Sequence, residues 1–171
     1  KVGFSDLGPE ITIAAPGGNC VNTGAGEPCL YPILSTVNSG NHAPNAGGSA
    51  YTDSYDFAVG TSFSTPIVAG TVALMLSARP QLTPVEIKQA LQSSARAFPT
   101  SGADNGPDDP TPVTTCQAPT GADQLQCYCT NGLCGAGMLD AAAALHAVTS
   151  GLFARIESSP AAPAAGSALT F

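Results

Sequence analysis

The feature that most constrains this chain is a Gly-Thr-Ser-Phe-Ser-Thr-Pro turn at residues 60–66 that continues directly into an apolar segment, residues 67–76. Threonine and serine commonly start helices, and proline is tolerated within the first helical turn, where amide donors need few intrahelical partners. We therefore predict a helix that begins near Ser62, with Pro66 in its first turn. The residues that follow are apolar on nearly every side, and such a helix is normally buried. The sequence thus predicts a core helix that presents a serine at its N-terminus.

A serine at this position could take part in catalysis. Its hydroxyl lies beside unpaired backbone N–H groups, including that of Ser62 itself, and beside the positive end of the helix dipole. Such donors can stabilise an oxyanion. The hydroxyl also needs a base, usually a histidine oriented by a carboxylate, before it becomes a nucleophile. The simpler interpretation is that Ser62 or Ser64 only caps the helix, and the length of the motif decides between the two.

The full string, Gly60-Thr61-Ser62-x-Ser64-x-Pro66-x-Val68-Ala69-Gly70, resembles the nucleophile signature of subtilisin-like serine proteases. Two flanking segments occur in the order of that family: residues 2–17, which end in Ala-Pro-Gly, and Gly-Ala-Gly-Met-Leu-Asp at residues 135–140. Three matches in order make chance an unlikely source, since longer motifs in the right context carry fewer false positives. The resemblance implies that Ser62 is the nucleophile, supported by Gly60, Thr61, Ser64 and Pro66.

The resemblance also implies the fold and the domain organisation. Residues 1–148 are expected to form the C-terminal half of a three-layer α/β/α domain with a mainly parallel sheet, and the helix from Ser62 would run through its centre. Residues 149–166 have the Ala/Pro composition of a linker, and residues 167–171 resemble the opening of an accessory β module. Alone, this half would leave apolar faces exposed, so it should be unstable or need its complement.

The rest of a catalytic triad is not recognisable in the sequence. The family places its aspartate, its His-Gly-Thr segment and its oxyanion asparagine ahead of the serine, so we expect these in an N-terminal half of the same enzyme. His42 in a Gly/Asn/Pro loop and His146 in an alanine-rich helix are poor substitutes for the base. Asp53 and Asp56 are better interpreted as carboxylates that shape the turn. The chain alone is therefore expected to be inactive.

Composition narrows the partners and the compartment. The 171 residues carry a net charge of −7, which argues against nucleic acid or an anionic membrane surface, and no apolar run is expected to reach the ~18 residues of a membrane span. The expected partner is a protein or peptide substrate. Six cysteines in a chain with few charges indicate disulfides and secretion. The cysteines are Cys20, Cys29, Cys116, Cys127, Cys129 and Cys134.

Cysteine spacing distinguishes disulfides from a metal site. Cys20 and Cys29 are isolated and close in sequence, so we expect them to pair, while the other four allow three pairings. Their C-x-C and C-x4-C spacings differ from the paired C-x-x-C of structural zinc. No metal is assigned and no cofactor is required. Calcium is possible as a structural ion in the acidic segment that contains Asp104, Asn105, Asp108 and Asp109, but a plain surface loop is preferred because the EF-hand spacing is lacking.

The remaining pattern predicts the other elements. A short strand is expected at residues 11–15, a long loop at 18–50, and a weak strand at 51–59. Thr-Pro-Val-Glu at residues 83–86 has the form of a capping box for an amphipathic helix that ends near Arg96 or Ala97. An irregular segment follows at 99–126, and a helix is expected at 139–148.

Two other functions remain open from sequence. One is a sedolisin, an acid serine peptidase with a similar Gly-Thr-Ser segment that uses glutamate and aspartate. The other is a secreted, non-catalytic structural or binding fragment. A pH–activity profile would separate the first from a subtilisin, because a histidine base stops working below its pKa. Labelling by a phosphonofluoridate would separate the second.

Overall fold

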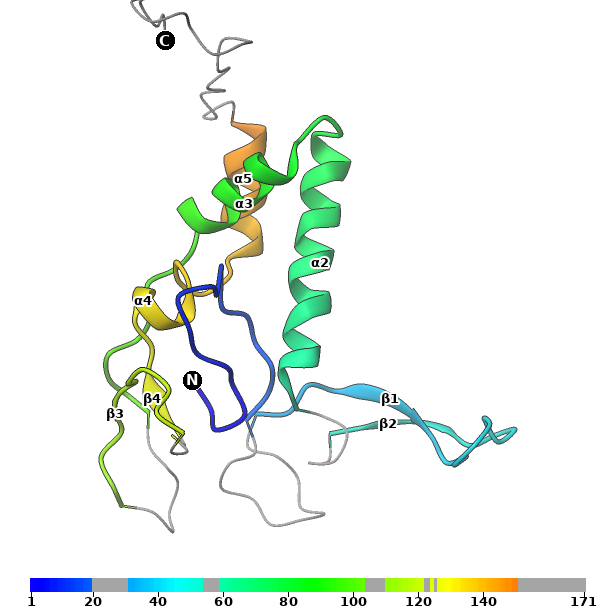
Figure 1. Ribbon diagram of the computed structural model, residues 1–171. Coiled ribbons are helices and arrows are strands. Elements are labelled where there is room, and N and C mark those ends of the chain that lie inside the picture. Colours follow the sequence, from blue (N-terminus) through cyan, green and yellow to red (C-terminus); the bar gives the residue numbers. More distant parts are fainter. Residues whose placement is uncertain (20–30, 54–58, 104–109, 122–123, 125, 151–171) are drawn as a thin grey trace, which may run out of the picture.

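The computed structural model describes residues 1–19, 31–53, 59–103, 110–121, 124 and 126–150. Within these ranges the chain contains helices and short strands, an α/β composition (Figure 1). In chain order the elements are β1 (Ser35–Asn38), β2 (Ser49–Thr52), α2 (Thr61–Ala78), α3 (Pro84–Ser93), β3 (Thr114–Thr115), β4 (Cys127–Tyr128), α4 (Asn131–Cys134) and α5 (Ala141–Thr149).

The core lies where α5 packs against both α2 and α3 (Figure 1). Its buried apolar side chains come from these helices and from the segments that join them: Met75, Leu82, Ala90, Leu91, Leu139, Ala144 and Val148. Alanine at two of these positions lets the helix backbones approach closely. The hydrophobic effect therefore holds α2 along one face only, through its C-terminal half.

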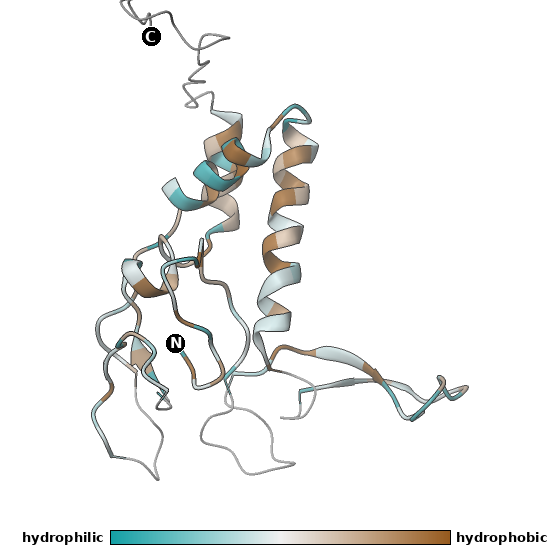
Figure 2. Cartoon of the chain, viewed as in Figure 1, coloured by the Kyte–Doolittle hydropathy of each residue, from teal (hydrophilic) through white to brown (hydrophobic). Residues whose placement is uncertain are grey.

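Helix α2 begins at Thr61, as predicted, but it is not buried on all sides in this chain. Only Thr71 and Met75 are buried among its 18 residues. Apolar side chains on other faces are open, with Leu74 55% and Ile67 36% exposed, and Figure 2 shows apolar residues along the visible side of the helix. The prediction of burial was wrong for the chain by itself because α5 packs against only one side of α2. The expectation that apolar faces stay uncovered is confirmed.

The two shorter core helices have the expected starts. Thr83 caps α3 in a complete capping box: its Oγ1 accepts from the amide of Glu86, and its own amide donates to the Glu86 carboxylate at 2.7 Å. Helix α3 ends at Ser93, three residues before the predicted end. In α5, Asp140 accepts from the amide of Ala143 at 2.9 Å and also lies 3.6 Å from the guanidinium of Arg96. Each cap satisfies an amide that the helix leaves unpaired.

Three distant segments meet beside the core at Met138. The backbone there forms a parallel bridge to Ala14 and an antiparallel bridge to Arg96. Amide–carbonyl bonds of 2.7–3.1 Å join residues 12–14, 96 and 136–139. The strand predicted at residues 11–15 is thus reduced to a single bridge at Ala14, whose partner Met138 is itself an isolated bridge residue between Ala14 and Arg96.

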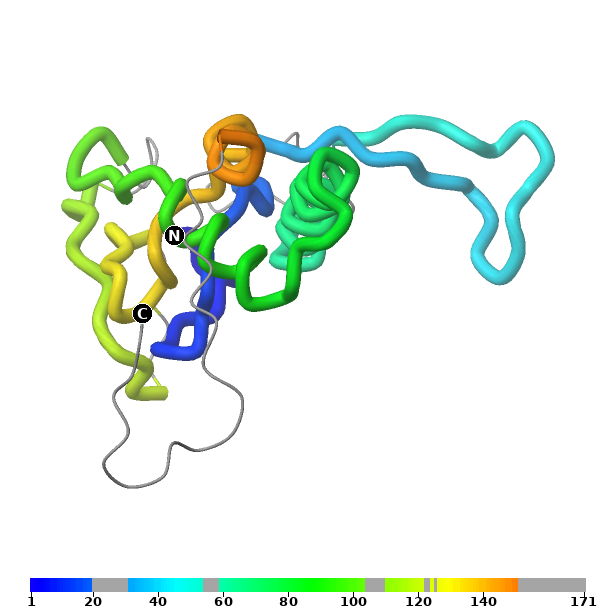
Figure 3. Tube along the Cα trace, turned by 90° about the horizontal axis from the view of Figure 1, so that it is seen from above, coloured from blue at the N-terminus to red at the C-terminus, as the bar shows by residue number. Residues whose placement is uncertain are grey.

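The strands form two separate two-stranded ladders, and the mainly parallel sheet is not present among the described residues. β1 and β2 are antiparallel, with Ser35 opposite Thr52, whereas β3 and β4 pair in parallel over two residues. The loop predicted over residues 18–50 contains β1, which sequence analysis missed. Its hairpin extends away from the helices (Figure 3). Asn38 closes the hairpin loop by accepting from the amides of Gly40 and Asn45.

Several sequence predictions fall outside the described residues. These are the Cys20–Cys29 pair, Asp56, most of the strand at 51–59, the acidic segment at 104–109, nearly all of the linker at 149–166, and the module start at 167–171.

Candidate active site

Ser62 lies in the first turn of α2 and is exposed to solvent. The helix is preceded by Gly60, whose φ of 143° lies in a region that residues other than glycine rarely adopt. The Gly60 amide donates to the carbonyl of Gly17 at 2.7 Å, and its carbonyl accepts from Phe63 at 3.0 Å. Within the described part of the chain, neither the hydroxyl nor the amide of Ser62 has a hydrogen-bond partner. Both groups are therefore available to a ligand.

Pro66 lies deeper in the helix than predicted. Since α2 starts at Thr61, Pro66 is its sixth residue and belongs to the second turn. The expectation that Pro66 occupies the first turn was therefore wrong by one turn. A proline lacks the N–H that would bond to the carbonyl four residues earlier, so the carbonyl of Ser62 loses its intrahelical donor. The helix thus begins with polar backbone groups of Ser62 that the helix itself does not satisfy.

Ser64 anchors the first turn of α2 to the segment that ends in Ala-Pro-Gly. Its hydroxyl is shared between two acceptors, the carbonyl of Ala15 at 3.0 Å and the carbonyl of Pro16 at 3.1 Å. At Gly17 the approach is so close that an added Cβ would lie 2.8 Å from both the Gly60 carbonyl oxygen and the Ser64 hydroxyl. Sequence analysis placed Ser64 in the motif but missed this contact, which spans about 48 residues of chain. The Ala-Pro-Gly segment that matched the family in the sequence is the segment that Ser64 contacts, so that match could have pointed to the contact.

We expect Ser64→Ala to lower the free energy of unfolding by about 1 kcal/mol, because one side chain–carbonyl hydrogen bond is lost and two carbonyls lose their donor. Chemical denaturation measures this change. The matched control is Ser93→Ala: that hydroxyl contacts only Ala90 of its own helix, so its loss should change stability by less than about 0.5 kcal/mol. Equal effects of the two substitutions would contradict the anchoring role.

A cavity of about 880 Å³ lies beside the first two turns of α2. Its wall is formed by α2 residues Thr61, Ser64, Thr65, Val68 and Ala69, by residues 10–18, and by residues near both disulfides. Ser62 is not among the lining residues, so its side chain lies at the exposed edge of the helix rather than in this cavity. Together with the exposed apolar faces of α2, the cavity is a second uncovered region next to the predicted nucleophile.

Among the described residues, neither His42, His146 nor Asp53 lies in the first turn of α2 or bonds to Ser62. His42 lies exposed in the loop between β1 and β2, and Asp53 is exposed just after β2. His146 is exposed on α5, which lies alongside the C-terminal part of α2, away from its first turn (Figure 1). The judgement that the two histidines are poor candidates for the base is consistent with these positions.

Two disulfides connect the four described cysteines. Cys116 pairs with Cys127, which links β4 to the residue after β3, and Cys129 pairs with Cys134 at the end of α4. This selects one of the three pairings that sequence left open. The first residue lies against the same region: the α-amino group of Lys1 donates to the carbonyl of Cys127 at 2.6 Å.

Comparison with known proteins decides the family. Residues 2–126 match the subtilase family over well more than half of the chain. The chain belongs to the subtilase family. The Gly-Thr-Ser segment at the start of α2 lies within this match, as does the Ala-Pro-Gly segment to which Ser64 is anchored.

Named relatives agree with this subtilase assignment. The chain is 35% identical over 152 residues to an extracellular protease of Xanthomonas campestris, a match that covers 88% of the chain and 18% of that protein. It is 37% identical over 92 residues to a halolysin-like extracellular serine protease of Natrialba magadii, covering 54% of the chain and 12% of the relative. A protease structure from Pseudoalteromonas arctica superposes with a TM-score of 0.55 at 33% identity, covering 82% of the chain and 30% of that structure. The chain thus spans less than a third of each of these relatives.

Helix α2 has one more property that bears on its surroundings. By length and composition alone it would suffice to cross a membrane, with a mean hydropathy of 1.3 over 18 residues of which 11% are buried. The sequence prediction that no apolar run reaches about 18 residues was therefore wrong for this helix, because its few serine and threonine residues hardly lower the mean hydropathy. A core helix of a soluble protein passes the same test while mostly buried, which α2 is not within the described residues. The hydropathy therefore describes a helix that needs a cover.

Proposed function

We propose that this chain is the nucleophile-bearing part of a secreted serine endopeptidase, with Ser62 as the nucleophile. The observation that carries the proposal is the exposed Ser62 at the start of α2, whose hydroxyl and amide have no partner among the described residues. Gly60 and Ser64 hold that turn to the Ala-Pro-Gly segment by two independent contacts. Secretion is supported by the extracellular relatives and by two disulfides.

The chemistry follows from the position of Ser62. Its oxygen attacks the carbonyl carbon of the scissile peptide bond, while a histidine base takes the hydroxyl proton. The developing oxyanion accepts a hydrogen bond from the Ser62 amide, which the helix leaves unpaired, and the positive end of the α2 dipole adds favourable potential. The base then returns the proton to the departing amine, and water hydrolyses the acyl-enzyme. Gly60, Thr61, Ser64 and Pro66 set the geometry of the turn.

The base, the orienting carboxylate and the oxyanion asparagine would come from an N-terminal half of the same polypeptide. Two uncovered features support such a partner: the exposed apolar faces of α2 and the cavity beside its first two turns. In this proposal the N-terminal half supplies the strands that complete a three-layer α/β/α domain around α2, so the helix becomes a core element rather than a membrane span. The chain alone hydrolyses no peptide because its hydroxyl is not activated. Protein or peptide is the substrate, no cofactor is required, and calcium would be structural only.

A pH–activity profile of the full-length protein tests this function against an acid peptidase of the sedolisin type. A histidine base acts only when neutral, so kcat/KM is expected to fall as the pH decreases through about 6.5, the ordinary pKa of histidine. Tenfold loss per pH unit below that value is the expected limit for one essential base. Full activity retained near pH 4 would instead favour a carboxylate base. The chain alone serves as the inactive control.

The non-catalytic alternative is favoured by the absence of a base near Ser62 among the described residues. It predicts that the full-length protein cleaves no peptide at any pH while the fold remains intact. The exposure of Ser62 argues against it, because a serine without a catalytic role does not require an accessible hydroxyl and amide at a helix start.

A further inference from the structure

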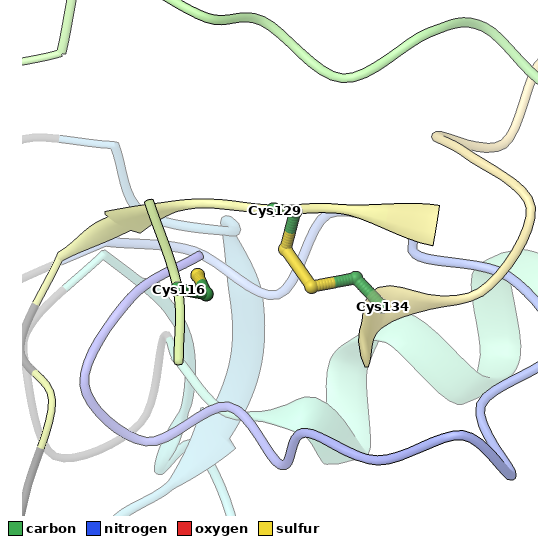
Figure 4. Close-up of side chains that lie close together, drawn as sticks. All are labelled: Cys116, Cys129 and Cys134. Carbon is green, nitrogen blue, oxygen red and sulfur yellow. A yellow bond between two sulfur atoms is a disulfide. The ribbon is translucent and has the colours of Figure 1, made fainter. Parts of the chain in front are cut away.

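The two disulfides form one group of sulfur atoms rather than two separate links. The Sγ atoms of Cys116, Cys129 and Cys134 all lie within 4.8 Å of one another. Figure 4 shows Cys116 beside the bond that joins Cys129 to Cys134. Among the described residues this group includes Cys116 but not its partner Cys127. One sulfur of the first disulfide therefore faces the second disulfide, and the other does not.

The strand register explains the proximity. β3 and β4 pair in parallel with Thr114 opposite Cys127 and Thr115 opposite Tyr128, and the amide of Cys116 continues the ladder by donating to Tyr128 at 2.9 Å. One residue further along, Cys116 comes beside Cys129. Neighbouring strands are about 4.8 Å apart, within the Cα separation of roughly 4.4–6.8 Å that a disulfide needs. The Sγ atoms of Cys116 and Cys129 accordingly lie within 4.8 Å of each other.

We propose that these three sulfurs form a thiol–disulfide exchange site: an external thiolate attacks Cys127, forms a mixed disulfide with it and releases the Cys116 thiolate, which then attacks the Cys129–Cys134 disulfide. The thiolate of Cys116 forms a new S–S bond to Cys129 or Cys134, and the other sulfur leaves as a thiolate that takes up a proton. One S–S bond forms and one breaks, so no net oxidation or reduction occurs. Cys127 lacks this route because its sulfur lies outside the group.

The exchange would move a covalent link within the fold. The Cys129–Cys134 bond ties β4 to the last residue of α4, directly before the Gly135 turn that contacts residues 12–13. Attack on Cys129 transfers that link to Cys116 beside β3 and frees Cys134. Cys134 and Cys116 are each 4% exposed, so once Cys116 is released the neighbouring disulfide is the partner most readily available to it.

Two matched variants test the exchange without any added reductant. Cys127→Ser leaves Cys116 as the unpaired thiol, and Cys116→Ser leaves Cys127 unpaired. Each full chain is held at neutral pH, quenched with acid to protonate thiolates, and labelled with a maleimide under denaturing conditions. Mass spectrometry of peptides then locates the label. In Cys127→Ser the label is expected on Cys129 or Cys134, several-fold above its level there in Cys116→Ser, where it should stay on Cys127.

Label that stays on Cys116 in the Cys127→Ser variant would overturn the proposal, as would equal migration in both variants. Should the Cys127→Ser chain fail to fold, the unmutated chain is treated with one equivalent of a trialkylphosphine, which reduces one disulfide and becomes the phosphine oxide. Exchange predicts label on Cys127 together with Cys129 or Cys134, one thiol from each original pair. Label confined to the original pairs would exclude exchange.

Discussion

Substituting alanine for Ser62 in the full-length protein is expected to lower kcat for peptide hydrolysis by about 10⁶-fold, the loss observed when subtilisin is deprived of its nucleophile. The physical reason is that the remaining base and carboxylate have no hydroxyl to activate, so the acyl-enzyme route is closed. Substrate binding should survive, because the change removes one exposed oxygen. Steady-state kinetics on a chromogenic peptide measure both quantities.

The matched control for this substitution is Ser64→Ala in the same turn. It removes an anchoring hydrogen bond but leaves the nucleophile, so its loss of kcat should be smaller than that of Ser62→Ala by several orders of magnitude. Unfolding measurements on both variants exclude a trivial cause, since the exposed Ser62 hydroxyl contributes no contact among the described residues. Comparable activity losses in the two variants would defeat the assignment of Ser62.

Gly135→Ala is expected to produce the largest loss of stability, about 3 kcal/mol. Gly135 has φ +83° and ψ −167°, a region open essentially to glycine only, which costs another residue roughly 1–3 kcal/mol. Its added Cβ would also lie 2.5 Å from the backbone carbon of Thr12 and 2.6 Å from the amide nitrogen of Ile13. Backbone atoms cannot rotate away as a side chain can, so overpacking adds about 1–3 kcal/mol. Chemical denaturation of the full-length protein measures the loss.

Gly102→Ala separates the two causes of that loss. Gly102 has a nearly identical φ of +85°, yet nothing lies within 4 Å of a Cβ built there. This variant should lose only the conformational part, about 1 kcal/mol. If both variants lost the same amount, the contact between the Gly135 turn and residues 12–13 would not contribute to stability.

Local chemistry explains which elements the sequence predicted well. The capping box at Thr83 and Glu86 and the cap at Asp140 satisfy amides within a few residues, so both helix starts are encoded locally. The start of α2 at Thr61 differs, because its N-cap is Gly60 and no side chain caps the helix. The family resemblance added the identity of Ser62, which the residues themselves left undecided between a cap and a nucleophile.

The failures concern contacts between distant segments. The apolar character of residues 67–76 shows that burial of this segment is favourable. It does not show which elements of the chain cover the helix, and α5 covers only one side. The strand at residues 11–15 depends on Met138, more than 120 positions later, and shrinks to a bridge. The selection of one cysteine pairing out of three likewise depends on the β3–β4 register, which has no local signal.

The most direct test of the account is to identify the residue that a phosphonofluoridate modifies in the full-length protein. Such reagents react with a serine only where a base activates it and donors stabilise the adduct. Peptide mapping by mass spectrometry is predicted to find one adduct, on Ser62, and none in the Ser62→Ala variant or in the chain alone. An adduct on another serine, or a folded and active protein that takes up no label at Ser62, would contradict the account.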